Sequence, residues 1–280
     1  MYWLPVRARC ASGGIGLDTT RIFLEQGANV TAHFRTSDAT LQPLLDTYGS
    51  EHLHLASASL SHELDVRALF IALTSSDNPF GPIEILIVNH GEYASADAPV
   101  KDMTLDQWNN TIKSNLTSSF LVVREYLLAL EKGIKGGIEE GQFGQRAAII
   151  LVGSTAGKYG EAGHADYSAS KSAMMYGLTL SLKNEIVRIA PKGRVNCVAP
   201  GWTKTPMAAD ALQQPMIMYR ALATTPLKKV AEPNDIANQI VLLASSTVSG
   251  HVTGQVLMIE GGMEGRLLNL PHDLDLPGEI

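Results

Sequence analysis

The chain has 280 residues, of which 45% are hydrophobic and 18% are charged, a composition typical of globular proteins. Its formal net charge of -6 gives no sign of a surface that binds nucleic acid or membrane headgroups. No apolar run approaches the ~20 residues that span a bilayer, and the two cysteines cannot build a disulfide framework. We therefore expect a cytoplasmic protein whose partner is a small molecule, with no nucleic acid, membrane or metal involved.

The N-terminal stretch predicts a nucleotide-binding turn. Residues 4–9 are expected to form a strand, although Pro5 is a poor residue for a central strand. Gly13, Gly14 and Gly16 then open a helical pattern, and such a turn lets backbone N–H groups approach a pyrophosphate. The alternative is a plain flexible turn. From this stretch we predict dinucleotide contacts by Ser12, Gly14, Ile15 and Gly16.

The residues after the second expected strand bear on the choice of nucleotide. Residues 29–34 form this strand, and Arg35 follows it. An acidic residue at this position holds the ribose hydroxyls of NAD, whereas an arginine accommodates the additional phosphate of NADP. Phe34 takes the place of the acid. The pattern favours NADP(H) over NAD(H), the alternative being that Arg35 is an ordinary exposed loop residue.

Helical and strand patterns alternate along the rest of the chain. We expect helices at 38–48, 62–74, 105–130, from Tyr167 to about 189, and at 235–244, and strands at 52–58, 83–88, 147–152, 195–199 and 252–259. In the helix at 62–74 the candidate buried residues are Leu64, Ala68, Leu69 and Ile71. The alternation predicts an α/β fold: one doubly wound Rossmann-like domain over residues 1–280, with about seven parallel strands and helices on both faces.

Three segments stand apart from this alternation. Residues 131–146 are glycine-rich and charged, so we expect a surface excursion. Residues 202–229 are rich in methionine and alanine, which favours a lid over an apolar substrate, with a merely packed helix pair as the alternative. The C-terminal tail, 266–280, is expected either to pack across an interface between subunits or to be loose.

The stretch from Ser154 to Lys171 carries the predicted chemistry. Tyr167 and Lys171 are four residues apart and share one helix face. An ammonium group ~4 Å from a phenol contributes about 4 kcal/mol at an effective dielectric near 20. That equals the cost of moving a tyrosine pKa by about 3 units towards neutrality. Ser154 can bond the same substrate oxygen. Asn115 lies in the middle of a predicted helix, where asparagine is unfavourable, so it has either a surface position or a function.

Several motifs, in order, resemble those of the short-chain dehydrogenase/reductase family, and the resemblance covers nearly the whole chain. Gly14-Ile-Gly16 resembles the end of the family's glycine motif, and Asn89-His-Gly91 resembles its Asn-Asn-Ala-Gly turn. The family's catalytic tetrad corresponds to Asn115, Ser154, Tyr167 and Lys171. Its nicotinamide-side motif and last strand are matched by Pro200-Gly201 with Thr205 and Met207, and by Thr253-Gly-Gln255 with Gly261-Gly262.

The resemblance implies an NADP(H)-dependent oxidoreductase that reduces a ketone or oxidises a secondary alcohol. Tyr167 would exchange the proton with the substrate oxygen, Ser154 would bond that oxygen, and Asn115 would anchor a relay water. Lys171 would lower the pKa of Tyr167 and hold the nicotinamide ribose. Further cofactor contacts are implied for Ser59, Asn89, Gly91, Pro200, Gly201, Thr203 and Thr205, and pocket positions for Glu92, Tyr93, Lys158, Tyr159 and Trp202. Since the family commonly forms dimers and tetramers, we expect a homodimer or homotetramer.

Two departures from the family pattern keep other interpretations open. Arg9 and Cys10 stand where the family's glycine motif begins with Thr-Gly, and Ser59 stands where an aspartate usually contacts adenine. One alternative is therefore a non-redox member of the fold with weakened dinucleotide binding, acting as a binding or scaffold subunit or as a cyclase-like or lyase-like enzyme. Another is that residues 1–9 are not the natural start of the protein.

Overall fold

The computed structural model describes residues 6–9, 13–75, 78, 80–93, 97–138, 142–264 and 269–277, with the backbone alone for 6–9. These residues form one seven-stranded parallel sheet in the order β3-β2-β1-β4-β5-β6-β7. The strands are β1 (Val6–Arg9), β2 (Val30–Phe34), β3 (Leu53–Ser57), β4 (Ile85–Val88), β5 (Ala148–Val152), β6 (Arg194–Pro200) and β7 (Val256–Ile259). The predicted fold class is confirmed.

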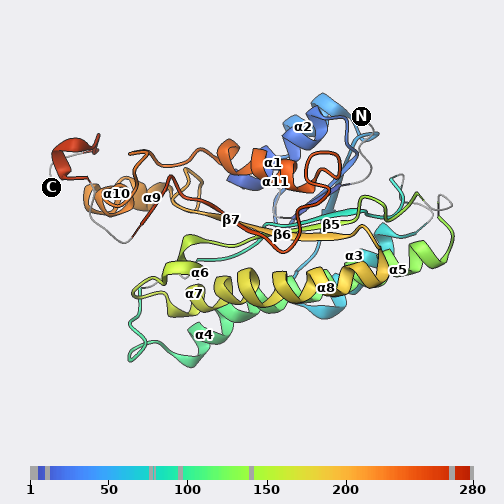
Figure 1. Ribbon diagram of the computed structural model, residues 1–280, viewed down its shortest axis with the longest axis horizontal. Coiled ribbons are helices and arrows are strands. Elements are labelled where there is room, and N and C mark those ends of the chain that lie inside the picture. The colour runs from blue at the N-terminus through green and yellow to red at the C-terminus, as the bar shows by residue number, and fades with distance from the viewer. Residues whose placement is uncertain are drawn as a thin grey trace.

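Helices cover both faces of this sheet (Figure 1). One face carries α1 (Gly14–Glu25), α2 (Gln42–Tyr48) and α11 (Pro233–Ala244). The other carries α3 (Glu63–Leu73), α4 (Leu105–Ile112), α5 (Ser118–Lys135), α6 (Thr155–Tyr159), α7 (Ala165–Ser172) and α8 (Thr179–Ile189). Two π-helical turns, η1 (Lys113–Thr117) and η2 (Ala173–Leu178), join α4 to α5 and α7 to α8. The expected helix at 105–130 is thus a longer one that runs on to Lys135.

The sheet is buried on both sides because its central strands are apolar at every position. In β4 the side chains of Ile85 and Ile87 belong to the core under α1 and α11, while Leu86 and Val88 belong to the core over α5 and α8. All four are at most 3% exposed. Alternate residues of a strand point to opposite faces, so a continuous apolar run suits a sheet that is covered twice.

The order of the strands sets the position of the site. β1 lies between β2 and β4, so the chain moves outwards to β3 and then returns to the other side of β1. In open parallel sheets ligands bind at the carboxyl edge beside such a reversal. The expected first strand is confirmed for Val6–Arg9, whereas Pro5 and Cys10, which motivated the doubts about it, lie outside the described residues.

The expected surface excursion at 131–146 is only partly correct. α5 extends through the first five of these residues, and Phe143 is 6% exposed. The Phe143 ring packs on Gly133, where an added Cβ would lie 2.5 Å from the ring carbon Cε1. The N–H of Gly144 donates to Glu84 Oε1 at 2.7 Å. One aromatic side chain and one buried carboxylate therefore hold this glycine-rich segment against the core.

The burial expected for the helix at 62–74 is wrong at three of its four positions. Leu69 is buried, but Leu64 and Ile71 are 76% and 69% exposed, and Ala68 is exposed as well. The stripe that faces the core is rotated from the predicted one and consists of Val66, Leu69, Phe70 and Leu73.

The segment 202–229 folds over the carboxyl edge of the sheet and contains two short helices, α9 (Ala209–Leu212) and α10 (Pro215–Leu222). The tail packs against it: Asn269 Nδ2 donates to the carbonyls of Leu222 at 2.7 Å and Thr225 at 2.9 Å. Leu274 adds to the small apolar cluster around α10. The described part of the tail, 269–277, is therefore packed against its own chain.

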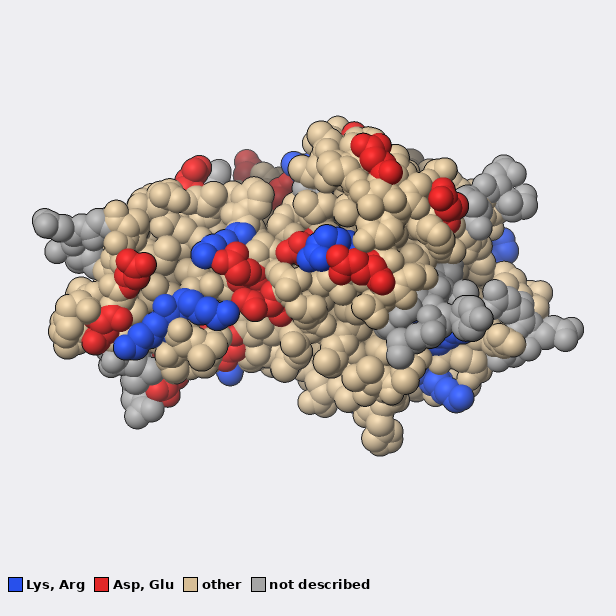
Figure 2. Space-filling model, turned by 90° about the horizontal axis from the view of Figure 1, so that it is seen from above, with Lys and Arg blue, Asp and Glu red and all other residues tan. Residues whose placement is uncertain are grey.

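The described residues bear on the expectation that neither a membrane nor a nucleic acid is a partner. None of its helices combines the length and the hydrophobicity needed to cross a bilayer. On the face seen in Figure 2, basic and acidic side chains lie next to one another. Ion pairs of this kind include Arg21 with Glu25 and Lys229 with Asp235.

Candidate active site

A cavity of about 480 Å³ lies at the carboxyl edge of the sheet. The start of α1, the ends of β4, β5 and β6, and the segment 202–229 surround it. Three of the four predicted catalytic residues, Ser154, Tyr167 and Lys171, line it together. Asn115 lies directly behind its wall, since a Cβ added to the lining residue Gly91 would be 3.3 Å from Asn115 Oδ1. The structure therefore brings the predicted tetrad to one place.

Ser154 and Tyr167 form the polar wall of the cavity. Ser154 follows β5 and caps α6, its hydroxyl accepting from the N–H of Ala156 at 3.2 Å. Tyr167 lies in the first turn of α7. Burial raises the pKa of the Tyr167 hydroxyl to about 12, and a hydrogen bond with Ser154 opposes that rise. The phenol is therefore a protonated hydroxyl at neutral pH. Both it and Ser154 line the cavity, where they can contact the same bound molecule.

Lys171 lies one helical turn beyond Tyr167 and is only 4% exposed. Its Nζ donates to the carbonyl oxygen of Val152 at 2.9 Å and lies 5.7 Å from the centre of the Tyr167 ring. The expected lowering of the pKa of Tyr167 below its ordinary value is not found, because desolvation of the phenol dominates. The charge of Glu161 raises that pKa further.

Asn115 lies in the π-helical turn η1 and is fully buried, so its predicted surface alternative is excluded. Its Oδ1 accepts from the N–H of Glu92 at 2.7 Å, and its Nδ2 donates to the carbonyl of Glu92 at 2.9 Å. Nδ2 also donates to Ser170 Oγ at 3.3 Å. The side-chain amide of Asn115, which is unfavourable in a regular helix, therefore joins the loop after β4 to α7 through these hydrogen bonds.

The residues present fit a nicotinamide dinucleotide. α1 begins at Gly14, and its N-cap, Gly13, has no side chain to occupy the N–H groups of the first turn. A Cβ on Gly14 would lie 2.6 Å from Thr205 Cγ2, and a Cβ on Gly91 would lie 3.2 Å from Lys171 Nζ. Side chains at these two positions would fill the space that a bound nucleotide needs.

Most of the predicted cofactor residues gather around this cavity. Its lining includes Gly14, Ile15, Asn89, Gly91, Lys171, Pro200, Gly201, Thr203 and Thr205. Gly16 is instead buried within α1, where its carbonyl accepts from Thr20 Oγ1. Arg35 and Ser59 follow β2 and β3 and are not part of the lining. Ser12 lies outside the described residues.

The substrate side of the cavity contains residues that the sequence analysis missed. Tyr93, Tyr159 and Trp202 line it as expected, whereas Glu92 and Lys158 do not. Glu161 and Arg220 are additional lining residues. The Tyr93 hydroxyl donates to Glu161 Oε1 at 2.9 Å, and its ring lies 5.0 Å from that of Tyr167. Glu161 sits in the turn between Ser154 and Tyr167, and that position was the one available signal.

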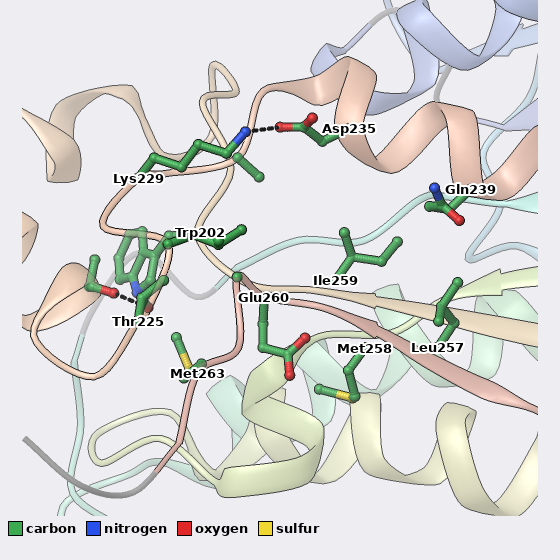
Figure 3. Close-up of a pocket in the computed structure, with 14 residues that line it drawn as sticks. Trp202, Thr225, Lys229, Asp235, Gln239, Leu257, Met258, Ile259, Glu260 and Met263 are labelled. Carbon is green, nitrogen blue, oxygen red and sulfur yellow. Dashed lines mark hydrogen bonds and ion pairs between the residues drawn. The ribbon is translucent and has the colours of Figure 1, made fainter. Parts of the chain in front are cut away.

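A second, smaller cavity of about 300 Å³ lies beside β7 (Figure 3). Lys229 and Asp235 form an ion pair of 3.3 Å at one side of it. Trp202 and Met263 line both cavities. The carbonyl of Met263 accepts from the Tyr159 hydroxyl at 3.0 Å, so this methionine is held in place between the two.

A doubly wound parallel sheet with Ser, Tyr, Lys and Asn at its carboxyl edge and a glycine turn beside them is the arrangement of a nicotinamide-dependent oxidoreductase. The family model described as enoyl-(acyl carrier protein) reductase matches residues 10–264. The chain belongs to the short-chain dehydrogenase/reductase family, whose enzymes interconvert alcohols and carbonyl compounds. The resemblance seen in the sequence is confirmed.

Individual relatives cover nearly the whole chain. The 3-oxoacyl-(acyl-carrier-protein) reductase FabG of Vibrio cholerae is 31% identical over 254 residues, which are 90% of this chain and 94% of that protein. Glucose 1-dehydrogenase of Gluconobacter oxydans is 32% identical over 260 residues, 90% of this chain and 89% of that one. Among solved structures, a glucose/ribitol dehydrogenase of Brucella melitensis has a TM-score of 0.79 and 29% identity, covering 94% and 97% of the two chains.

The raised pKa of Tyr167 is open to a direct test. Because burial places this pKa at about 12, the Tyr167 phenol should remain protonated in the free protein up to about pH 10. The tyrosinate absorbance should therefore develop identically in wild type and in Tyr167→Phe over this range. Ser154→Ala should raise the pKa further, since the lost hydrogen bond lowers it. A tyrosinate signal near neutral pH that disappears in Tyr167→Phe would show that Lys171 outweighs burial.

Proposed function

We propose that this protein is an NADP(H)-dependent oxidoreductase that reduces a ketone or oxidises a secondary alcohol. The observation that carries the proposal is the arrangement of Ser154, Tyr167 and Lys171 on one cavity together with the glycine turn of α1. The names of the relatives support the proposal. A 3-oxoacyl reductase acts on a ketone, and a glucose dehydrogenase acts on a hydroxyl-bearing carbon of a sugar.

Each protein group has a defined part in the proposed reaction. The bound nucleotide supplies the hydride in reduction and accepts it in oxidation. The Tyr167 hydroxyl donates its proton to the carbonyl oxygen during reduction, and its phenolate takes that proton back during oxidation. Ser154 donates a hydrogen bond to the same oxygen, while Lys171 orients the nicotinamide ribose. Since burial keeps Tyr167 protonated, the free protein already holds the proton that carbonyl reduction consumes.

The proton-transfer role of Tyr167 is tested by Tyr167→Phe. Loss of the hydroxyl that we propose as the proton donor should lower kcat for carbonyl reduction by about 10²- to 10⁴-fold, the usual contribution of general acid catalysis. NADPH affinity, measured by fluorescence titration, should stay within about twofold. Tyr48→Phe on α2 is the matched control, because this tyrosine does not line the cavity and the variant should retain its activity. Appreciable turnover by Tyr167→Phe would remove Tyr167 from this role.

We propose that Arg35 binds the adenosine 2′-phosphate of NADP(H). It directly follows β2, its side chain is 65% exposed, and it lies on the nucleotide side of the carboxyl edge. Arg35→Ala should weaken NADPH by about 10- to 100-fold, since a hydrogen bond to a charged group is worth about 1.5–3 kcal/mol. NADH affinity should change little. Isothermal titration calorimetry gives both constants, with the exposed Arg67→Ala on α3 as control. Equal losses for the two nucleotides would contradict the phosphate contact.

We further propose a homodimer or homotetramer assembled through the long helices. Large apolar side chains are exposed along them, with Trp108 and Phe120 at 37% and 47% and Leu128 at 55%. On η2 and α8, Tyr176 and Leu180 are 42% and 40% exposed. Light scattering after size-exclusion chromatography should give a mass of two or four chains, and Leu128→Glu should lower it. A monomeric wild type would refute this proposal.

Two further expectations from the sequence stay predictions. They are a cytoplasmic location of the protein and a role of residues 202–229 as a lid over the substrate.

A further inference from the structure

We infer that Glu92 is a specificity residue of the nucleotide site: it competes with the adenosine 2′-phosphate for Arg35 and so moderates the preference for NADP(H). The inference rests on the proposed function, in which Arg35 is the phosphate ligand. It starts from an ion pair between Arg35 Nη1 and Glu92 Oε1. These residues are 57 positions apart in the sequence. Neither the glycine turn before α1 nor the four predicted catalytic residues depend on this ion pair.

The position of this pair in the fold points to the nucleotide. Arg35 follows β2 and Glu92 lies four residues beyond the end of β4. In the sheet, β1 lies between these two strands, and α1 is the next element of the chain after β1. The ion pair therefore crosses the carboxyl edge at the reversal of strand order, which is where a dinucleotide passes from its adenosine end to its nicotinamide end.

Glu92 is the fixed member of the pair. Both its backbone N–H and its carbonyl are bonded to the side chain of Asn115, at 2.7 and 2.9 Å. Asn115 is itself fully buried. Arg35 has a longer side chain that is 65% exposed, against 50% for Glu92. The carboxylate is thus presented from an anchored loop, and the guanidinium reaches across to it.

The energetics allow a phosphate to displace Glu92 at a cost. An exposed ion pair contributes only about 0–1 kcal/mol, whereas a phosphate offers the guanidinium a stronger bidentate partner. A phosphate that engages Arg35 Nη1 has to displace the Glu92 carboxylate from this nitrogen, and the carboxylate then lies close to the new phosphate. NAD(H) has no phosphate at this position and need not break the pair. Glu92 therefore lowers the affinity for NADP(H) selectively.

The test is Glu92→Gln, which keeps the size of the side chain and the backbone bonds to Asn115. Calorimetry at low salt should show NADPH binding about two- to fivefold tighter, the factor that an exposed pair accounts for, with NADH unchanged within error. In the Arg35→Ala background the gain should fall below about twofold. Glu25→Gln is the matched control, because Glu25 is an exposed glutamate that pairs with Arg21 on α1, and it should alter neither constant.

Each other result speaks against the inference. Equal tightening of both nucleotides would show a general effect of charge, and an undiminished gain in the Arg35→Ala background would show that Arg35 is not involved. Weaker NADH binding by Glu92→Gln would show that Glu92 is a ribose ligand and not a competitor. If wild type binds NADPH but Glu92→Gln changes nothing, the inference alone fails. If wild type binds neither nucleotide, the proposed function fails with it.

Discussion

The side-chain amide of Asn115 joins the parts of the site that come from distant regions of the chain. It bonds the backbone of Glu92, in the loop after β4, and the hydroxyl of Ser170, on the helix that carries Tyr167 and Lys171. Being fully buried, it has no water to replace these partners, so losing one would leave unsatisfied polar groups at a cost of about 1–3 kcal/mol each. The spacing between the loop after β4 and the helix that carries Tyr167 and Lys171 depends on this amide.

The π-helical turns beside the tetrad are part of the same construction. Asn115 lies within η1, and η2 begins two residues after Lys171. A π turn widens the helix and frees a backbone carbonyl from its usual partner. The carbonyl of Asn115 accepts from Ser119 Oγ at 2.6 Å. The carbonyl of Met174 accepts from the backbone N–H of Thr179 and, at 2.8 Å, from Thr179 Oγ1. Hydroxyls one turn further along the chain thus add hydrogen bonds at both π-helical turns.

Predictability from sequence differs between local and long-range features. That Ser154, Tyr167 and Lys171 line one cavity was predictable, because Tyr167 and Lys171 are neighbours on one helix and Ser154 follows a recognisable strand. The strands were predictable because doubly covered strands are continuous apolar runs. The stripe of α3 was not, since Leu64 and Ile71 are apolar yet exposed, and periodicity alone does not show which side of a helix the sheet occupies.

The features that sequence reasoning missed arise from contacts between distant segments. The pKa of Tyr167 was expected to fall because Lys171 is near in sequence, but burial by the surrounding elements decides its direction. Glu161 was overlooked although it lies between two predicted catalytic residues, because its role depends on the hydroxyl of Tyr93, 68 positions away. The pairing of Arg35 with Glu92 depends in the same way on the strand order, which places β2 and β4 on either side of β1.

The backbone and the side chain of Glu92 have different partners. Its backbone belongs to the catalytic end, because Asn115 holds both its N–H and its carbonyl. Its carboxylate pairs with Arg35, which we propose as the ligand of the adenosine 2′-phosphate. Backbone bonds are independent of side-chain identity, so the choice of residue 92 can alter the electrostatics around Arg35 while the loop stays in place. If Arg35 binds the phosphate as we propose, a substitution at residue 92 changes the nucleotide preference and leaves Ser154, Tyr167 and Lys171 in place.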